Sequence, residues 1–212
     1  VALVDAETGQ LLRMLQRTAE EVDDSANRDV VTTFALNPRL PELVTASRNL
    51  MLRQWSIDYG FSPPAVQCVR SIKGHQEPIA CVDYDPTGVF LATGSVDGSA
   101  RVFDMRGGFA THNFRGHGGI VSLVRFHPDP LKLLLVTASD DGAARIWSLH
   151  DKSCVAMLSG GHMSAVTCVA FSSDGYTMAT GSRDKVVNMW ELRHHTLLKT
   201  LAVYEECEGL AI

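Results

Sequence analysis

The sequence lacks long runs of apolar residues. Stretches such as residues 133–136 (LLLV) are far shorter than the roughly 20 residues that a membrane-spanning helix needs. It also lacks a basic region followed by an apolar core, so we expect neither a membrane partner nor a secretory signal peptide. With 212 residues and 45% hydrophobic content, the chain can nevertheless bury a sizeable soluble core.

An excess of positive charge is also missing. The chain has 19 lysine and arginine residues against 24 aspartate and glutamate residues, for a formal net charge of −5. Binding nucleic acid through its phosphates requires a basic stripe, which the chain as a whole does not provide. Two acidic stretches, residues 20–29 and 204–208, are typical of solvated loops. This balance favours other proteins as the main partners, with RNA contacts secondary.

Paired cysteines, metal-binding clusters and phosphate-binding loops are absent from the sequence as well. The five cysteines are widely spaced without a Cys-x-x-Cys pair, which favours reduced thiols in a cytosolic or nuclear protein. No GxxxxGK[ST] loop occurs, and the histidines outside the repeats described below have no paired spacing with cysteines or carboxylates. We therefore expect no cofactor, no metal site and no small-molecule substrate.

What the sequence does contain is an internal repeat. The dipeptide Gly-His begins at positions 74, 116 and 161, with spacings of 42 and 45 residues. A second marker, a large aromatic residue, recurs at steps of 48, 44 and 43 residues, at Trp55, Phe103, Trp147 and Trp190. Two independent markers that share one period in the forties indicate a repeat architecture.

Each repeat alternates apolar and polar residues with a period of two, which is the pattern of half-buried β-strands. First strands, each followed by a turn, are expected within 79–88, 120–130 and 165–175. Second strands are expected at 90–94, 134–138 and 176–181, and third strands at 99–104, 143–148 and 186–191. A fourth strand completes each repeat, and no convincing helix is found. Four short antiparallel strands per repeat describe one blade of a β-propeller.

We therefore predict an all-β chain whose residues 1–212 form a partial β-propeller, about four and a half blades of an expected seven. One early repeat is degenerate: Asn27 stands where the histidine would be, and Arg48-Asn49 stands in place of x-Asp at the turn. The expected boundaries are the end of a preceding blade at 1–16, a degenerate blade at 27–73, three regular blades at 74–115, 116–160 and 161–203, and the start of a further blade at 204–212.

The repeats resemble WD40 repeats, which begin with Gly-His, carry Ser-x-Asp before a tight turn, and continue with an aromatic and a polar or acidic residue. The resemblance implies a buried chain of hydrogen bonds, from the tryptophan N–H to a serine or threonine, then to the histidine and the turn aspartate. The residues assigned to this network are His75, Ser95, Asp97, His117, Ser139, Asp141, Trp147, His162, Ser182, Asp184 and Trp190.

Histidine, serine and aspartate are also the residue types of a nucleophilic triad. A catalytic site normally occurs once per domain, so a set that recurs in every regular blade favours a structural role and a non-enzymatic protein. One blade departs from the pattern, because Phe103 stands where the other three repeats carry tryptophan and has no N–H to donate. We expect Phe103 still to fill the space between blades, with the pair His75–Asp97 intact.

In a propeller, binding surfaces lie on the faces, where loops connect rigid strands. The loops entering the first strands and the turns between the second and third strands should emerge on the same face. Their mixture of apolar and charged residues suits protein partners better than a catalytic pocket. The residues of this candidate protein-binding face are Gln76, Pro78, Val96, Gly118, Ile120, Asp140, Met163, Ala165 and Arg183.

Three longer stretches, residues 107–129, 154–192 and 203–210, resemble a subgroup of WD40 proteins associated with U3 small nucleolar RNA. The most specific features are Thr111-His112 and the acidic residues that follow Tyr204. The resemblance implies a subunit of the UtpB subcomplex of the small-subunit processome, which acts on the 18S part of pre-ribosomal RNA in the nucleolus. Its implied partners are other UtpB subunits, with U3 RNA or pre-ribosomal RNA bound mainly within the complex.

Three classes of function compete on the sequence alone. A protein-interaction scaffold in ribosome biogenesis is the favoured one. The alternative is a WD40 adaptor of another complex, such as a ubiquitin-ligase substrate receptor or a signalling scaffold. A propeller enzyme comes third, because no unique acid, base or metal-binding set lies outside the repeat.

Overall fold

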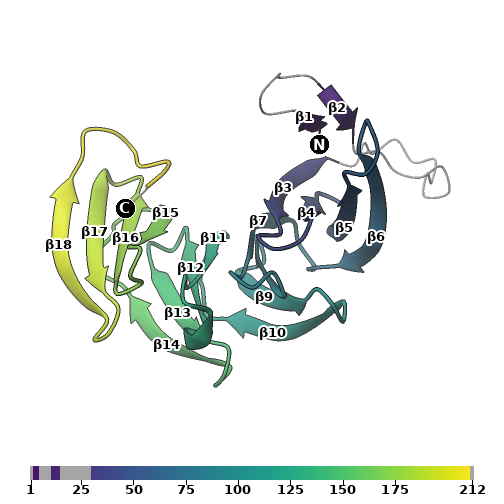
Figure 1. Cartoon of the computed structure of the whole chain (residues 1–212). Coiled ribbons are helices and arrows are strands. Elements are labelled where there is room, and N and C mark those ends of the chain that lie inside the picture. Colours follow the sequence, from purple (N-terminus) through teal and green to yellow (C-terminus); the bar gives the residue numbers. More distant parts are fainter. Residues whose placement is uncertain (1, 5–10, 15–29, 211–212) are drawn as a thin grey trace.

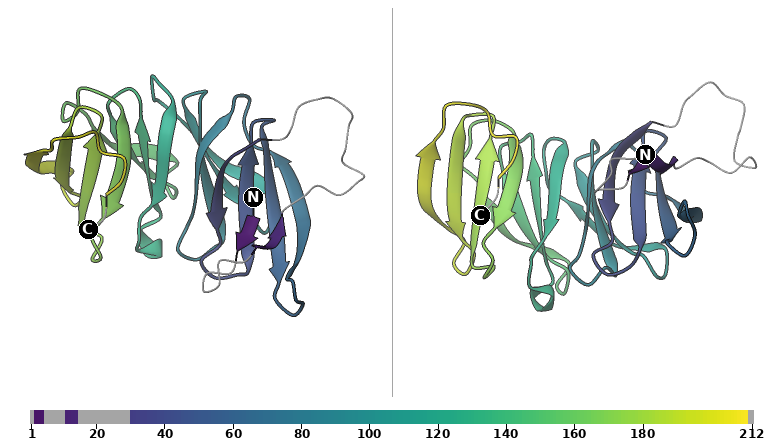
Figure 2. Two further views of the ribbon diagram at one scale, coloured as in Figure 1. Left: turned by 90° about the horizontal axis from the view of Figure 1, so that it is seen from above. Right: turned by 45° about the horizontal axis from the view of Figure 1, so that its top comes forward.

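Four four-stranded sheets follow one another around an open arc (Figure 1). This arrangement is seen in a computed structural model that describes residues 2–4, 11–14 and 30–210. In two turned views the sheets stand side by side like consecutive blades (Figure 2). The predicted all-β, partial-propeller fold is confirmed.

Each sheet is an antiparallel meander whose strands pair in chain order. The first sheet contains β3 (Val31–Leu36), β4 (Glu42–Ser47), β5 (Met51–Asp58) and β6 (Ala65–Lys73). The second contains β7 (Ile79–Tyr84), β8 (Phe90–Ser95), β9 (Ser99–Asp104) and β10 (Phe109–Arg115). The third contains β11 (Val121–Phe126), β12 (Leu134–Ser139), β13 (Ala144–Ser148) and β14 (Ser153–Leu158). The fourth contains β15 (Val166–Phe171), β16 (Thr177–Ser182), β17 (Val186–Glu191) and β18 (Thr196–Ala202).

Smaller elements lie outside these sheets. β1 (Ala2–Val4) and β2 (Leu11–Met14) pair with each other in a two-stranded antiparallel sheet. A 3-10 turn of three residues, Pro130–Lys132, lies between β11 and β12. Among the described residues, no helix has the length and apolar character needed to cross a membrane. Asn27, which stands at the expected histidine position, lies outside the described residues.

The second strand of each sheet is its most buried element. In β4, β8, β12 and β16, every residue after the first is buried. This complete burial explains why these strands read as continuous runs of small and apolar residues rather than as an alternation. The tight turns that follow β8 and β12 need a positive φ, which Gly98 and Gly142 supply at +74° and +76°.

The hydrophobic core lies between successive sheets, and the closing aromatic residues fill it. Trp147 of the third sheet stacks on Phe114 of the second, with 4.9 Å between ring centroids. Phe103 of the second sheet lies in one buried apolar cluster with Val44 and Leu52 of the first. Phe103 therefore fills the space between sheets, as expected from the sequence.

Hydrogen bonds from side-chain hydroxyls also connect the first strands of neighbouring sheets. Thr32 Oγ1 donates to the carbonyl of Ile79 at 2.9 Å, and Ser122 Oγ donates to the carbonyl of Val166 at 2.9 Å. Thr167 makes the equivalent bond to the carbonyl of Cys207. The segment after β18 therefore returns to β15, where it takes the place that the first strand of the next sheet has at the other junctions (Figure 1).

Candidate functional site

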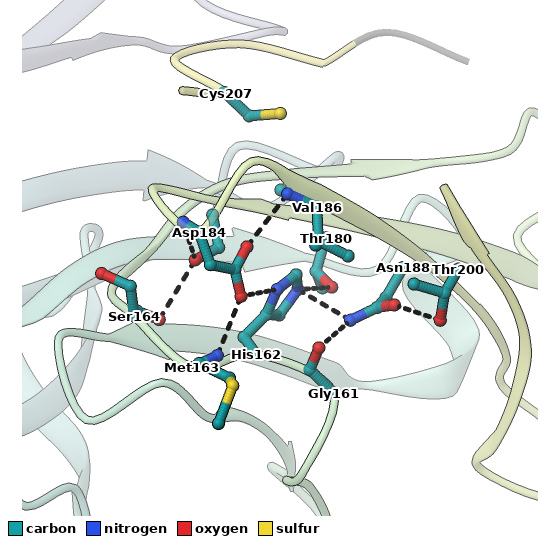
Figure 3. A network of polar contacts seen from close by, with 12 residues as sticks. Gly161, His162, Met163, Ser164, Thr180, Asp184, Val186, Asn188, Thr200 and Cys207 are labelled. Atoms are coloured by element: carbon teal, nitrogen blue, oxygen red, sulfur yellow. Dashed lines mark hydrogen bonds and ion pairs between the residues drawn. The ribbon is translucent and has the colours of Figure 1, made fainter. Parts of the chain in front are cut away.

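The three repeat histidines lie in the loops that enter β7, β11 and β15, and their side chains are almost completely buried. Each Nε2 atom lies 2.7 Å from a threonine hydroxyl, in the pairs His75–Thr93, His117–Thr137 and His162–Thr180. Each Nδ1 atom faces a turn aspartate, at 3.3, 3.0 and 3.2 Å in the pairs His75–Asp97, His117–Asp141 and His162–Asp184. Figure 3 shows this arrangement around His162.

The indole N–H groups complete the chain of hydrogen bonds. Trp147 Nε1 donates to Thr137 Oγ1 at 2.8 Å, and Trp190 Nε1 donates to Thr180 Oγ1 at 2.9 Å. Around His162, one donor order satisfies the chain: the indole N–H donates to the threonine oxygen, the threonine O–H to histidine Nε2, and histidine Nδ1–H to the aspartate. This order requires a neutral imidazole with its proton on Nδ1. Around His117, Arg145 also lies against Nδ1 and forms an ion pair with Asp141 at 2.8 Å.

Threonine, and not the serine that the sequence analysis assigns, relays the hydrogen bond in these sheets. Each serine lies two residues further on, at the end of the second strand, where its hydroxyl accepts the N–H of the turn aspartate at 3.2 Å. The serine takes this role because the backbone N–H groups of a tight turn need a local acceptor. The serines in question are Ser95, Ser139 and Ser182. The relay threonines are visible in the sequence as a recurring Thr-x-Ser pattern, at Thr45, Thr93, Thr137 and Thr180.

The turn aspartates connect each turn to the loop that carries the histidine. Asp141 accepts the backbone N–H of Gly118 at 3.0 Å, and Asp184 accepts that of Met163 at 2.8 Å (Figure 3). Burial acts to raise the pKa of Asp184, but the bonds from Met163 and His162 outweigh it and hold the pKa below its ordinary value. The aspartate thus stays charged and clamps two segments of the same face together.

The residue two places before the closing aromatic residue also bonds to the loop that carries the histidine. Arg101 donates to the carbonyl of Gly74 at 2.9 Å, and Asn188 donates to that of Gly161 at 2.6 Å. Asn188 also accepts the hydroxyl of Thr200 at 2.7 Å (Figure 3). The motif comparison does not indicate this position, although an arginine or asparagine recurs there in the sequence.

The geometry does not assemble a nucleophilic site. A catalytic triad needs an accessible hydroxyl within hydrogen-bond reach of the histidine. The hydroxyl beside His117 belongs to Thr137, which is 0% exposed, whereas Ser139 bonds to the backbone of the turn. Within the part of the chain that the structure describes, no group of His, Cys, Asp or Glu side chains could hold a metal ion. The repeat His, Thr, Asp and Trp residues are thus joined by hydrogen bonds and do not have the arrangement of a nucleophilic triad.

Two of the three repeat histidines, His75 and His117, are less basic than free imidazole. Burial lowers the pKa of His75 and His117 below 6.5, although Asp97 and Asp141 act in the opposite direction. Below about pH 6.5 the unfolded chain thus binds more protons than the folded chain does, so the free energy of unfolding decreases as the pH falls. Burial also raises the pKa of Asp83 to about 6. This carboxyl acts in the opposite sense, because the folded chain binds its proton more readily between about pH 6 and 4.

We expect the free energy of unfolding to decrease as the pH falls from 7 to 5, by at most about 1.4 kcal/mol per pH unit for each of His75 and His117. Asp83→Asn should steepen this decrease below pH 6, because it removes the opposing carboxyl. The asparagine keeps an oxygen that can accept the Phe126 N–H, which lies 3.1 Å from Asp83. Urea denaturation at several pH values measures both effects. A pH-independent midpoint would contradict neutral buried histidines, and a shallower slope in the variant would contradict the raised pKa of Asp83.

The second sheet lacks the indole donor, and a serine supports its aspartate instead. Phe103 is 2% exposed and offers no N–H to the hydroxyl of Thr93. Ser99, which stands where the other two regular blades have alanine and valine, donates its hydroxyl to Asp97 at 2.5 Å. The contact between His75 and Asp97 is present at 3.3 Å, so the network here is shortened by one donor and otherwise complete.

Phe103→Trp should supply the missing N–H to Thr93. The expected result is a free energy of unfolding that is unchanged or raised by up to about 1.5 kcal/mol, the worth of one neutral hydrogen bond. Urea denaturation of the variant beside the parent protein measures the difference. A loss above about 2 kcal/mol would show instead that the larger ring overpacks the space between the first two sheets.

The residues of the candidate protein-binding face gather at one end of the sheets. A recurring backbone hydrogen bond joins each loop that enters a first strand to the turn between the second and third strands of the same sheet. The turn residue donates its N–H to the loop carbonyl at 3.0–3.1 Å, in the pairs Val96–Pro78, Asp140–Ile120 and Arg183–Ala165. The two segments expected to share a face therefore do so.

Exposure separates the members of this face. Met163 is 98% exposed and Val96 is 42% exposed. Gln76, Gly118, Asp140 and Arg183 are exposed as well, and Pro78 and Ile120 are half-buried. Ala165 is only 8% exposed, so its side chain does not line the face and only its carbonyl takes part, in the bond to the turn. Sequence position alone cannot reveal this, because burial there depends on how the loop folds over the strand end.

Comparison with known proteins identifies the family. The family model described as "WD domain, G-beta repeat" matches residues 66–104, 108–148 and 152–191. Each of the first two matches starts in the outer strand of one sheet and runs through three strands of the next. The sequence repeat is thus offset by one strand from the sheets.

Several relatives match nearly the whole chain. Transducin beta-like protein 3 of Bos taurus is 40% identical over 212 residues, which is 100% of this chain and 25% of that protein. The protein of the same name in Homo sapiens is 42% identical over 212 residues, 100% of this chain and 24% of that protein. The U3 small nucleolar RNA-associated protein 13 of Saccharomyces cerevisiae is 32% identical over 189 residues, 84% of this chain and 22% of that protein. The chain spans about a quarter of the length of these curated relatives. With its sheets, its buried network and three matched repeats, the chain belongs to the WD40 repeat family.

Proposed function

We propose that the chain is a non-enzymatic protein-interaction scaffold in ribosome biogenesis, with a part in assembling the small-subunit processome and in processing pre-18S ribosomal RNA. The observation that supports this most is the similarity over the whole chain to transducin beta-like protein 3, at 40–42% identity in Bos taurus and Homo sapiens. The yeast relative associated with U3 small nucleolar RNA supports the same process. The proposed location is the nucleolus.

The proposed partners are other UtpB subunits, with U3 RNA or pre-ribosomal RNA contacted mainly within the complex. The candidate protein-binding face supports protein partners, because it exposes both an apolar side chain, Met163, and the charged side chains of Asp140 and Arg183. The buried network holds the loops of this face in place and presents them on rigid strands. In this proposal the four sheets are consecutive blades, and residues 204–212 begin a further one.

Affinity purification of the full-length tagged protein from cells tests this function. The expected result is enrichment of U3 RNA together with other subunits of the processome. Recovery of cullin adaptors or signalling proteins without U3 RNA would instead support a WD40 adaptor of another complex, and would overturn the proposal.

A charge-reversed variant, Asp140→Arg with Arg183→Asp, tests the face itself. Both side chains are exposed, so the fold should tolerate the exchange. We expect the variant to recover less of its protein partners than the parent does. Undiminished recovery would show that partners bind elsewhere on the molecule.

A further inference from the structure

A groove of about 300 Å³ lies where the first two sheets meet, at the end opposite the candidate protein-binding face. Its walls come from the loop between β3 and β4, the outer strand β6, and the turns after β7 and β9. Three of its lining residues are arginines: Arg39, Arg70 and Arg106. Residues distant in the sequence thus bring three positive charges together in a chain whose net charge is negative.

Backbone carbonyls, and not carboxylates, hold two of these arginines. Arg39 Nε donates to the carbonyl of Pro86 at 3.1 Å. Arg70 donates to the carbonyl of Met105 at 2.9 Å and to that of Arg106 at 3.2 Å. No ion pair links any of the three arginines to a carboxylate of the described residues. Hydrogen bonds therefore hold the guanidinium groups of Arg39 and Arg70 in position, and no carboxylate of the described residues neutralises any of the three arginines.

One acidic residue, Glu42, also lines the groove, and its carboxylate accepts a hydrogen bond from a neighbouring side chain. Gln54 Nε2 donates to Glu42 Oε2 at 2.8 Å. Glu42 is half-buried at the start of β4, and it contacts none of the three guanidinium groups by an ion pair in the described structure. A single carboxylate against three arginines leaves the groove with an excess of positive charge.

The next junction, between the second and third sheets, shows what distinguishes this groove. There Phe90 takes the position of Glu42, and His112 takes the position of Arg70, bonding to the carbonyl of Leu149 at 2.8 Å. The remaining hollow measures only about 10 Å³. An apolar ring thus fills this junction, whereas the junction of the degenerate blade with the second sheet is open and charged.

We propose that this groove, the arginine groove, binds an acidic, partly apolar peptide segment of a partner protein. The planar guanidinium group matches a carboxylate with two parallel hydrogen bonds, which favours Asp and Glu side chains of the ligand. Leu40 and Val69, which are 51% and 53% exposed, offer apolar contact beside the arginines. None of the lining residues is aromatic, so the groove lacks the stacking surfaces on which single-stranded RNA bases bind.

The test measures binding of fluorescein-labelled probes to the full-length protein by fluorescence anisotropy. The probes are a short peptide of Asp, Glu, Leu and Ser, the same peptide with Asn and Gln in place of Asp and Glu, and an oligouridylate of equal length. The test variant is the double substitution Arg39→Glu with Arg106→Glu. The control is Arg193→Glu, because Arg193 occupies the equivalent turn position in the fourth sheet, is exposed, and lines no part of the groove.

We expect the acidic peptide to bind the parent protein and Arg193→Glu equally, and to bind the double variant at least about tenfold more weakly, since charge-assisted hydrogen bonds are lost. The uncharged peptide should bind no more tightly than the acidic peptide binds the double variant. Acidic-peptide binding that is absent, or equal in the double variant, overturns the inference. So does arginine-dependent binding of the oligouridylate alone, which would make the groove an RNA site. The inference rests on the proposed scaffold function only for the choice of a protein partner, and recovery of U3 RNA from cells would be unaffected by its failure.

Discussion

Replacing Trp147 by alanine is expected to lower the free energy of unfolding by about 3–5 kcal/mol, the usual cost of deleting a large buried aromatic ring. The side chain is 4% exposed and stacks on Phe114 of the preceding sheet, with 4.9 Å between ring centroids. Its N–H also donates to Thr137 at 2.8 Å. Alanine would therefore open a cavity between the second and third sheets and remove one hydrogen bond from the network.

Trp147→Phe is the matched control for this substitution. It keeps an aromatic ring between the sheets and removes the N–H donor with only part of the ring volume, which is the arrangement that the second sheet already has at Phe103. The expected loss is about 1–2 kcal/mol, because one buried hydrogen bond is lost and little volume. Urea denaturation gives both values. Similar losses for the two variants would contradict the assignment of the main stabilising effect to the packing of the ring.

Much of the fold follows from the sequence because the strands are local. The third strands expected at 99–104 and 186–191 are observed as β9 and β17 with the same bounds. The second strands extend one residue further than expected, to Ser95, Ser139 and Ser182. Each of these serines ends its strand by pairing with the first residue of the first strand while its hydroxyl serves the turn. A strand end of this kind has both strand and turn chemistry, so a pattern of alternation places it only to within a residue.

The identity of the relay was harder to predict from the sequence. Thr93 and Ser95 lie on the same side of β8, since they are two residues apart, and both have a hydroxyl. Only the pairing of β8 with β9 and the path of the histidine loop decide which hydroxyl meets His75. The sequence shows both candidates in every repeat, and the choice between them is made by tertiary contacts.

The arginine groove could not be predicted from the sequence at all. Arg39, Arg70 and Arg106 lie in three separate segments of the chain, and no spacing marks them as a set. The groove exists because the degenerate blade has Glu42 where the next blade has Phe90, and because two sheets meet there. Contacts between sheets, unlike strands and turns, have no local signal in the sequence.

The proposed function assigns different tasks to repeated and unrepeated residues. The repeated His, Thr and Trp side chains are buried, and the Asp side chains at the turns are 11–19% exposed. These side chains bond to each other and so connect the strands and loops of each sheet. The unrepeated side chains, such as Met163 and the groove arginines, are exposed and differ from blade to blade. Specific recognition of partners is expected from this second group. Loss of partner binding without loss of stability should therefore be confined to it.

The claim that the repeated set is a hydrogen-bond chain is tested most directly by comparing Thr137→Val with Thr93→Val. The two substitutions have the same shape change and lie at equivalent positions, but they remove different numbers of bonds. Thr137 accepts the N–H of Trp147 and donates to His117. Thr93 has no indole donor, and its single hydroxyl proton serves either His75 at 2.7 Å or the carbonyl of Arg101 at 3.3 Å. Both sites are fully buried, at 0% exposure, so water cannot replace the lost partners.

Each buried polar group left without a partner costs about 1–3 kcal/mol, so Thr137→Val should lower the free energy of unfolding by about 2–4 kcal/mol and Thr93→Val by about 1–2 kcal/mol. Urea denaturation of the two variants beside the parent protein gives the difference. A loss for Thr137→Val that exceeds the loss for Thr93→Val by at least about 1 kcal/mol is the predicted result. Equal losses, or a larger loss for Thr93→Val, would contradict the chain of hydrogen bonds from tryptophan through threonine to histidine.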